Sequence, residues 1–168
     1  ETMLDVAKID SQALELQRGP VQLPLLLRMV ASQFSAALQE RQLTLEMGAM
    51  AGLPEIAGDT EALQKVFRHL LINAIKYTPD HGRITINGRL LPNEADPMIE
   101  IAIADTGIGI DREHHEVIFE KFYQTGEVML HSSGETTFMG GGPGLGLAIA
   151  KGIVGAHHGC VWAESPGF

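Results

Sequence analysis

The chain carries the segment Leu70-Leu71-Ile72-Asn73-Ala74-Ile75-Lys76-Tyr77-Thr78-Pro79, from which the fold prediction starts. It closes a helical pattern that begins after Asp59, a residue favoured at the N-cap position, and ends in the turn-forming residues 78–82. Apolar residues recur at helical spacing along this pattern and predict a face that packs on a core. That face consists of Leu63, Val66, Phe67, Leu70, Leu71 and Ala74. The sequence therefore predicts a long amphipathic helix between Asp59 and Thr78.

A narrow polar stripe follows the same helix. It consists of His69, Asn73, Lys76 and Tyr77. Such a stripe is commonly a solvated face, but here Leu70, Ile72 and Ile75 flank it, which favours the lining of a groove. The amide oxygen of Asn73 is a hard ligand of the kind that Mg²⁺ prefers. Lys76 would supply a point charge for phosphate.

Two glycine-rich boxes come later in the chain. They are Asp105-Thr106-Gly107-Ile108-Gly109-Ile110 and Gly142-Pro143-Gly144-Leu145-Gly146-Leu147. The second box leads directly into an apolar helix predicted from Leu145 to about His157, and a helix N-terminus favours anions. A flexible linker is the alternative for this box. No lysine completes a P-loop, and Leu147, Ile149 and Arg112 stand where a dinucleotide fingerprint needs its last glycine.

Asp105 ends the second of two predicted strands, 83–91 and 98–105, that are joined by the turn-rich segment 92–97. It shares the parity of the strand's isoleucines, so its carboxylate is expected to face the core side and not water. A buried carboxylate needs a hydrogen-bond donor, and the exocyclic amine of a purine would fit. Capping of the following turn by the side chain is an equally good interpretation.

The remaining elements are predicted from periodicity and from turn residues. They are a helix end at 2–17, an edge strand at 21–23, a helix from Pro24 to about 40, a strand at 43–47, a short helix at 113–121, a mobile loop at 124–143 and a strand at 161–163. Along the chain, these elements mix helices with strands that form hairpin-like pairs. The fold class is therefore expected to be α/β (α+β), with a helix layer over one face of a mixed sheet.

The net charge of −9 argues against a nucleic-acid partner and means that phosphate must be held by local devices, such as a metal ion, a lysine or backbone N–H groups. The single cysteine, Cys160, cannot form an internal disulfide, so a reducing, cytoplasmic location is expected. The one apolar run near the start, 23–27, is too short for a bilayer and contains Pro24, and no signal peptide is seen. The chain reads as a piece of a longer protein.

In this order the motifs resemble the ATP-binding catalytic domain of two-component sensor histidine kinases, within the ATPases of the gyrase, heat-shock-chaperone and mismatch-repair type. The resemblance runs from about Val21 to the end. It implies a Bergerat-type two-layer sandwich that binds ATP and Mg²⁺ between the helix of the asparagine box and a lid at 124–143. Residues 1–18 resemble the end of a dimerisation helix, and 19–168 would form the ATP-binding domain.

The resemblance also implies roles for individual residues. Asn73 would be the magnesium ligand, Lys76 would approach the phosphates and Tyr77 the base. Asp105 would recognise adenine in the first glycine box. The other nucleotide-binding positions would be Gly107, Gly109 and Ile110, Phe122 of the phenylalanine box 119–123, and Gly142, Gly144, Leu145, Gly146 and Leu147 of the second glycine box.

Three departures from the family pattern stand out. His69 replaces an asparagine that many histidine kinases carry, at a position where hydrolysing relatives hold a glutamate base. His69 could orient water as a catalytic residue, or it could be a spacer or a hydrogen-bond donor to phosphate, and we favour the non-catalytic roles. Gln124 stands where an arginine often contacts phosphate, and the usual last strand is missing or lies beyond Phe168.

The implied activity is transfer of the γ-phosphoryl group of ATP to a histidine on a separate dimerisation domain, in an intact homodimer that serves a response regulator. No histidine of this chain lies in the expected His-Glu-x-x-x-Pro setting, so the phosphoacceptor is absent. The alternatives are an ATP hydrolase or serine kinase of the same fold, a nucleotide-sensing module without catalysis, and an interaction module with relic boxes.

Overall fold

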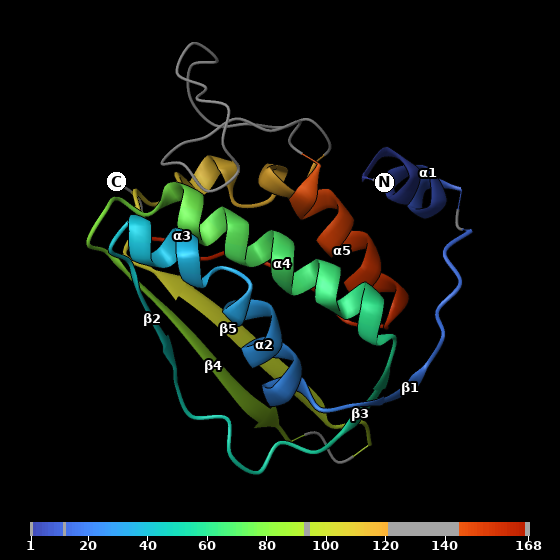
Figure 1. The fold of residues 1–168 in the computed structure, drawn as a ribbon. Coiled ribbons are helices and arrows are strands. Elements are labelled where there is room, and N and C mark those ends of the chain that lie inside the picture. Colours follow the sequence, from blue (N-terminus) through green and yellow to red (C-terminus); the bar gives the residue numbers. More distant parts are fainter. Residues whose placement is uncertain (1, 12, 93–94, 121–144, 167–168) are drawn as a thin grey trace.

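A layer of helices covers one face of a β-sheet in the computed structural model, which describes residues 2–11, 13–92, 95–120 and 145–166 (Figure 1). The sheet has the order β2-β4-β5, formed by Thr44–Met47, Arg83–Leu91 and Met98–Asp105. Strand β2 runs parallel to β4, whereas β4 and β5 are antiparallel. The expected mixed sheet with helices on one face is confirmed.

The β4–β5 hairpin has the predicted bounds and places Asp105 at one end of the sheet. Its register pairs Leu91 with Met98 at the turn and Ile84 with Asp105 at the open end. Ile84 and Ile86 are fully buried, because alternate residues of a strand face the same side and this side carries the helices. Asp105 lies directly opposite Ile84 and so belongs to the helix-covered side.

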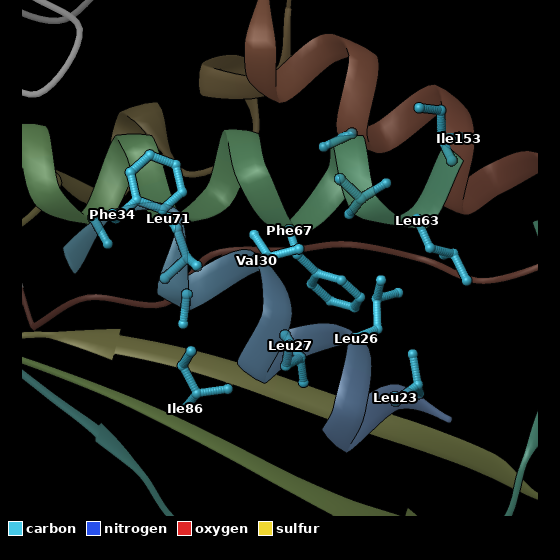
Figure 2. Close-up of a cluster of buried hydrophobic side chains, with 14 of the residues drawn as sticks. Leu23, Leu26, Leu27, Val30, Phe34, Leu63, Phe67, Leu71, Ile86 and Ile153 are labelled. Carbon is cyan, nitrogen blue, oxygen red and sulfur yellow. The ribbon is translucent and has the colours of Figure 1, made fainter. Parts of the chain in front are cut away.

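The core lies between the sheet and three helices, α2 (Leu23–Ser32), α4 (Thr60–Tyr77) and α5 (Gly146–Ala156). Figure 2 shows Leu27 of α2 lying between Phe67 of α4 and Ile86 of β4. Leu27 and Leu71 are fully buried, and truncation of such a side chain to alanine typically costs about 2–5 kcal/mol. This packing fixes α4 over the sheet.

The helix predicted from Pro24 to about residue 40 is interrupted. Pro24 does occupy the first turn of α2, but the helix ends at Ser32 and a short α3 (Ser35–Glu40) follows. Phe34 leaves helical geometry, with φ −102° and ψ 7°, and its buried ring occupies the core. Periodicity alone does not reveal this break in the helix.

Helix α1 (Thr2–Asp10) is shorter than the predicted 2–17. After Asp10 the Ser11 hydroxyl donates to the Ala7 carbonyl at 2.8 Å, and such local side-chain bonds compete with the helix. The helix packs on α5, where a Cβ on Gly152 would lie 2.6 Å from the Ile9 side chain. An ion pair of 3.0 Å between Lys65 and Asp5 also ties it to α4.

The edge strand expected at 21–23 lies two residues earlier. Strand β1 (Gly19–Val21) pairs antiparallel with β3 (Ile56–Gly58), because Leu23 already begins α2. We did not predict β3, which is three residues long and contains a glycine.

Two elements near the second half of the chain differ from expectation. The helix predicted at 113–121 is a pair of single 3₁₀ turns, η1 (Arg112–His114) and η2 (Val117–Phe119), of which only Phe119 is buried. Residues 161–163 are not a strand: within the described part of the chain they pair with no neighbouring strand, and Trp162 is exposed. An alternating apolar pattern needs a partner edge to become a strand.

Asp59 caps α4 and joins three segments. One carboxylate oxygen accepts from the Ala62 N–H at 3.1 Å, and the other accepts from the Gln17 N–H at 2.9 Å. Its own N–H donates to the His157 ring at 3.0 Å. Slight burial raises the pKa of the Asp59 carboxyl, but the donated bonds outweigh it and the net pKa is lowered. The carboxylate therefore stabilises the fold when ionised.

We expect Asp59→Ala to lower the free energy of unfolding at pH 7 by about 1 kcal/mol, the typical value of an N-cap. Asp59→Asn keeps one acceptor and should lose less. Because the folded pKa is depressed, the advantage of the wild type is complete above roughly pH 4 and disappears as the pH falls through the lowered value. Urea denaturation of the wild type and both variants, at several pH values on either side of about pH 4, measures this difference in the free energy of unfolding. A constant difference at every pH would contradict the ionised cap.

Candidate functional site

The polar stripe of α4 lies beside its buried face. Asn73 is partly buried, and no other described residue hydrogen-bonds its side-chain amide. Lys76 is also partly buried, with its Nζ 5.2 Å from the ring centroid of Tyr77. Burial lowers the pKa of the Lys76 ammonium, and no carboxylate among the described residues forms an ion pair with it. The stripe thus offers a hard oxygen and a cation that has no carboxylate partner in the described part of the chain.

The end of α4 is joined to the first glycine box through the main chain. The Ile108 N–H donates to the Tyr77 carbonyl at 3.1 Å, and the Thr106 N–H donates to the Arg83 carbonyl at 3.0 Å. A Cβ on Gly107 would lie 2.5 Å from the Tyr77 carbonyl oxygen, so only glycine permits this approach. Gly109 has φ +79°, a left-handed backbone conformation that glycine adopts readily because it has no Cβ.

Asp105 caps the turn of this box. Its Oδ1 accepts from the Gly107 N–H at 2.8 Å, so the capping interpretation is confirmed. The expectation that the side chain is shielded from water is wrong: the residue is exposed, because it lies at the end of the sheet beyond its isoleucine neighbours. Surrounding protein atoms nevertheless raise the pKa of the Asp105 carboxyl, and the bond from Gly107 only partly offsets this. Recognition of a purine stays a prediction.

The second glycine box reaches α4 at the other end of the stripe. Leu145 is buried, and Gly146 begins α5 against His69, where an added Cβ would lie 2.9 Å from the imidazole Nδ1. Leu147 is partly buried in the first turn of α5. His69 and Tyr77 are eight residues apart, roughly 12 Å along a helix. The two boxes therefore contact α4 at the two ends of one polar stripe.

Several predicted site residues are not tested by this geometry. Ile110 is partly buried, and its N–H donates to the Ser165 hydroxyl at 3.0 Å, at the edge of the first box. Phe122, Gly142 and Gly144 lie outside the described residues, as do Gln124 and the predicted lid at 124–143.

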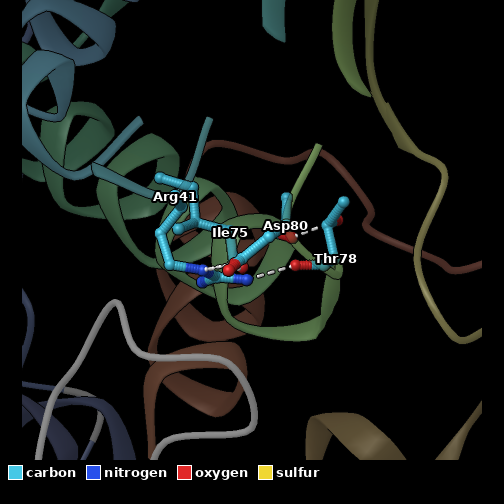
Figure 3. Close-up of polar contacts among 5 residues, drawn as sticks. Arg41, Ile75, Thr78 and Asp80 are labelled. Carbon is cyan, nitrogen blue, oxygen red and sulfur yellow. Dashed lines mark hydrogen bonds and ion pairs between the residues drawn. The ribbon is translucent and has the colours of Figure 1, made fainter. Parts of the chain in front are cut away.

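Sequence reasoning missed Arg41. Its guanidinium is buried and donates to the Ile75 carbonyl at 3.1 Å, to the Thr78 carbonyl and to the Asp80 carboxylate (Figure 3). The sequence held one signal for such a partner. In a helix the Ile75 carbonyl would accept from residue 79, which is Pro79 and has no N–H.

Comparison with known proteins decides the family. Residues 58–167 match the family described as histidine kinase-, DNA gyrase B-, and HSP90-like ATPase. The chain belongs to this family. It is therefore an ATP-binding domain of this ATPase type, and the expected resemblance and fold class are confirmed.

Curated relatives within this ATPase family are sensor kinases. Adaptive-response sensory kinase SasA of Gloeothece citriformis is 31% identical over 163 residues, which are 97% of this chain and 38% of SasA. Sensor histidine kinase WalK of Bacillus subtilis is 28% identical over 167 residues, 97% of this chain and 25% of WalK. The chain thus spans well under half the length of these relatives.

Solved structures agree with this assignment. Full-length ShkA in complex with AMPPNP superposes with a TM-score of 0.78 and 28% identity, over 98% of this chain and 32% of ShkA. Histidine kinase ThkA in complex with response regulator protein TrrA gives a TM-score of 0.71 at 22% identity, over 96% of this chain and 42% of ThkA, and so supports the fold. No helix in the described part of the ATPase domain has the length and apolarity to cross a membrane.

The close approach of the first box to α4 predicts that alanine at Gly107 lowers the stability of the protein, whereas alanine at Gly155, a glycine with free space around it, does not. Gly107→Ala places a methyl group against the Tyr77 carbonyl and should destabilise the protein by about 1–3 kcal/mol. Gly155→Ala in α5 meets no atom within 4 Å and should be neutral or stabilising by up to about 1 kcal/mol. Urea denaturation measures both. Equal stability of the two variants would contradict a close-packed box.

Proposed function

We propose that this domain binds ATP with Mg²⁺ along the polar stripe of α4 and donates the γ-phosphoryl group to a histidine on a separate dimerisation domain. The observation that carries the proposal is the placement of Asn73 and Lys76 between contacts with both glycine boxes. The kinase relatives and the AMPPNP complex of ShkA support it.

Lys76 is the proposed phosphate contact. Its ammonium is partly desolvated and has no carboxylate partner among the described residues, so an incoming phosphate would restore the favourable interaction that burial removes. The chain carries a net charge of −9, which repels a triphosphate. A local cation inside the site is therefore more effective than the general surface field.

Asn73 is the proposed magnesium ligand. Its amide oxygen fits a hard cation, and no described residue competes for it. When bound, Mg²⁺ neutralises charge on the phosphates and so favours phosphoryl transfer. A site with one protein oxygen is sufficient, because Mg²⁺ commonly keeps waters and takes the remaining ligands from phosphate.

The first glycine box is the proposed adenine side of the site. The Asp105 carboxylate would accept from the exocyclic amine, while Gly107 and Gly109 keep the backbone low enough for a flat base. Tyr77 and Ile110 would line the same side. His69 would act as a spacer, because its ring packs against the start of α5.

The proposed reaction balances without a further reactant. The acceptor imidazole nitrogen forms a bond to the γ-phosphorus as the bond to the β,γ-bridging oxygen breaks, and ADP leaves. The domain's own residues position the triphosphate and neutralise charge, which is most of what phosphoryl transfer requires. In the intact protein, residues 1–18 would end a dimerisation helix, 124–143 would form the lid, and a homodimer in the cytoplasm would serve a response regulator.

The first test is binding and labelling of the 168-residue chain. Calorimetry with ATP and Mg²⁺ should show one site with a dissociation constant between micromolar and millimolar, and saturation should raise the melting temperature. With γ-labelled ATP the chain alone should stay unlabelled, whereas addition of a dimerisation domain that carries the phosphoacceptor histidine should give labelled acceptor. Absence of binding, or stable label on the chain alone, would overturn the proposed function.

Asp105→Asn separates stability from recognition. Because desolvation by the surrounding protein atoms raises the folded pKa of Asp105, ionisation costs the folded state free energy as the pH rises through that pKa. The neutral variant should therefore be at least as stable as the wild type at pH 7. Its ATP affinity should fall roughly tenfold, because a charge-assisted hydrogen bond becomes a neutral one.

The selectivity of Asp105→Asn gives a second readout. An asparagine amide can donate to the 6-oxo group of guanine, so the preference for ATP over GTP should shrink. Wild-type affinity should also weaken on acidification, at a higher pH than an ordinary aspartate would require, and the variant should lack this dependence. If Asp105→Asn kept the wild-type affinity for ATP and the preference for ATP over GTP, Asp105 would not be the residue that recognises adenine.

A further inference from the structure

Arg41 is a buried cation that the proposed function does not use. Its residue exposure is only 8%, and it directly follows α3. Burial of a guanidinium is costly unless its donors are paired, so its partners indicate what it holds in place.

Two of these partners are carbonyls at the end of α4. Ile75 lacks a helical donor because Pro79 has no N–H, and the Thr78 carbonyl lies past the last helical residue, Tyr77. The third partner, the Asp80 carboxylate, is 59% exposed and so contributes less than a buried ion pair would. The buried part of Arg41 therefore acts mainly on the main chain of the helix end.

The helix end held by Arg41 is the part that carries the proposed site. Lys76 and Tyr77 lie between the two carbonyls, and the Tyr77 carbonyl accepts the Ile108 N–H of the first glycine box. Arg41 is also joined to the following turn, since its own carbonyl accepts the His81 N–H at 3.3 Å. One chain of contacts thus runs from α3 through the last turn of α4 to the glycine box.

We infer that Arg41 is a positioning residue of the nucleotide site: it fixes the last turn of α4 so that Lys76 and the Tyr77 carbonyl keep their places. The guanidinium spreads its five donors over a rigid planar fork, whereas a lysine ammonium gathers three donors at one point, so lysine is not equivalent. This inference rests on the proposed function, because it assigns Arg41 to the same site without contact to ATP.

Arg41→Lys is the informative variant, since Arg41→Ala leaves two carbonyls unpaired and is expected to unfold. At a temperature where circular dichroism shows it folded, Arg41→Lys should bind AMPPNP with Mg²⁺ roughly tenfold more weakly than the wild type. In the ligand-free protein the amide NMR signals of residues 105–109 should shift. A merely structural role would lower the melting temperature without either effect.

Two controls separate the carbonyl contacts from the charges. Asp80→Asn removes the exposed ion pair and keeps both carbonyl contacts. Arg89→Ala removes an exposed pair with Glu100 on the β4–β5 hairpin. Both should bind AMPPNP within twofold of the wild type. Loss of affinity in Asp80→Asn equal to that of Arg41→Lys would overturn the assignment to the carbonyls.

The wild type supplies a measurement that does not depend on folding of a variant. Coupling is reciprocal, so AMPPNP should slow exchange of the Arg41 Nη hydrogens, which donate to the Ile75 and Thr78 carbonyls, and shift their NMR signal. An unchanged signal at saturation, or wild-type affinity in folded Arg41→Lys, would overturn the inference while the proposed function stands. Failure of the wild type to bind AMPPNP at all would overturn the proposed function instead.

Discussion

Helix α4 ends next to a proline, and the donors that its last carbonyls lack come from two other parts of the chain. Arg41 donates to the Ile75 and Thr78 carbonyls, and the Ile108 N–H donates to the Tyr77 carbonyl. An unpaired buried carbonyl costs about 1–3 kcal/mol, so these contacts are required by the fold itself. They also bring α3, α4 and the first glycine box to one place. The requirement that completes the helix therefore also assembles the region that we propose as the adenine side of the site.

Helix α4 contributes to both the core and the candidate site. The helical period places the core residues and the candidate site residues on different faces of the helix. Leu71 and Ile75 are fully buried, whereas Asn73 and Lys76 between and beside them are only partly buried. This arrangement places Lys76 where protein atoms lower its pKa but where the side chain is still partly open to solvent. A rigid helix packed on both sides can hold a cation in this partly desolvated position, whereas a surface loop would release it to water.

The sequence was most informative where local signals and tertiary packing agree. The bounds of β4 and β5 and the cap of α4 at Asp59 follow from alternation and capping, and the structure has them as predicted. The break at Phe34, strand β3 and the absence of a strand at 161–163 depend on which partner lies nearby, and a single sequence does not give this. Arg41 illustrates the same limit. Pro79 in the sequence indicates that the Ile75 carbonyl lacks its helical N–H donor, but it does not indicate which residue donates instead.

The two glycine boxes are attached to α4 by different kinds of contact. The first is fixed to α4 by a directional main-chain bond from Ile108 to Tyr77, and a second such bond, from Thr106 to Arg83, fixes it to β4. The second meets α4 through the close packing of Gly146 against His69. Hydrogen bonds hold one geometry, whereas packed helices can slide by small amounts at lower cost. Because α5 also packs against Ile9 of α1, a displacement of α5 relative to α4 would be transmitted to the N-terminal helix, while the first box would keep its main-chain bond to α4.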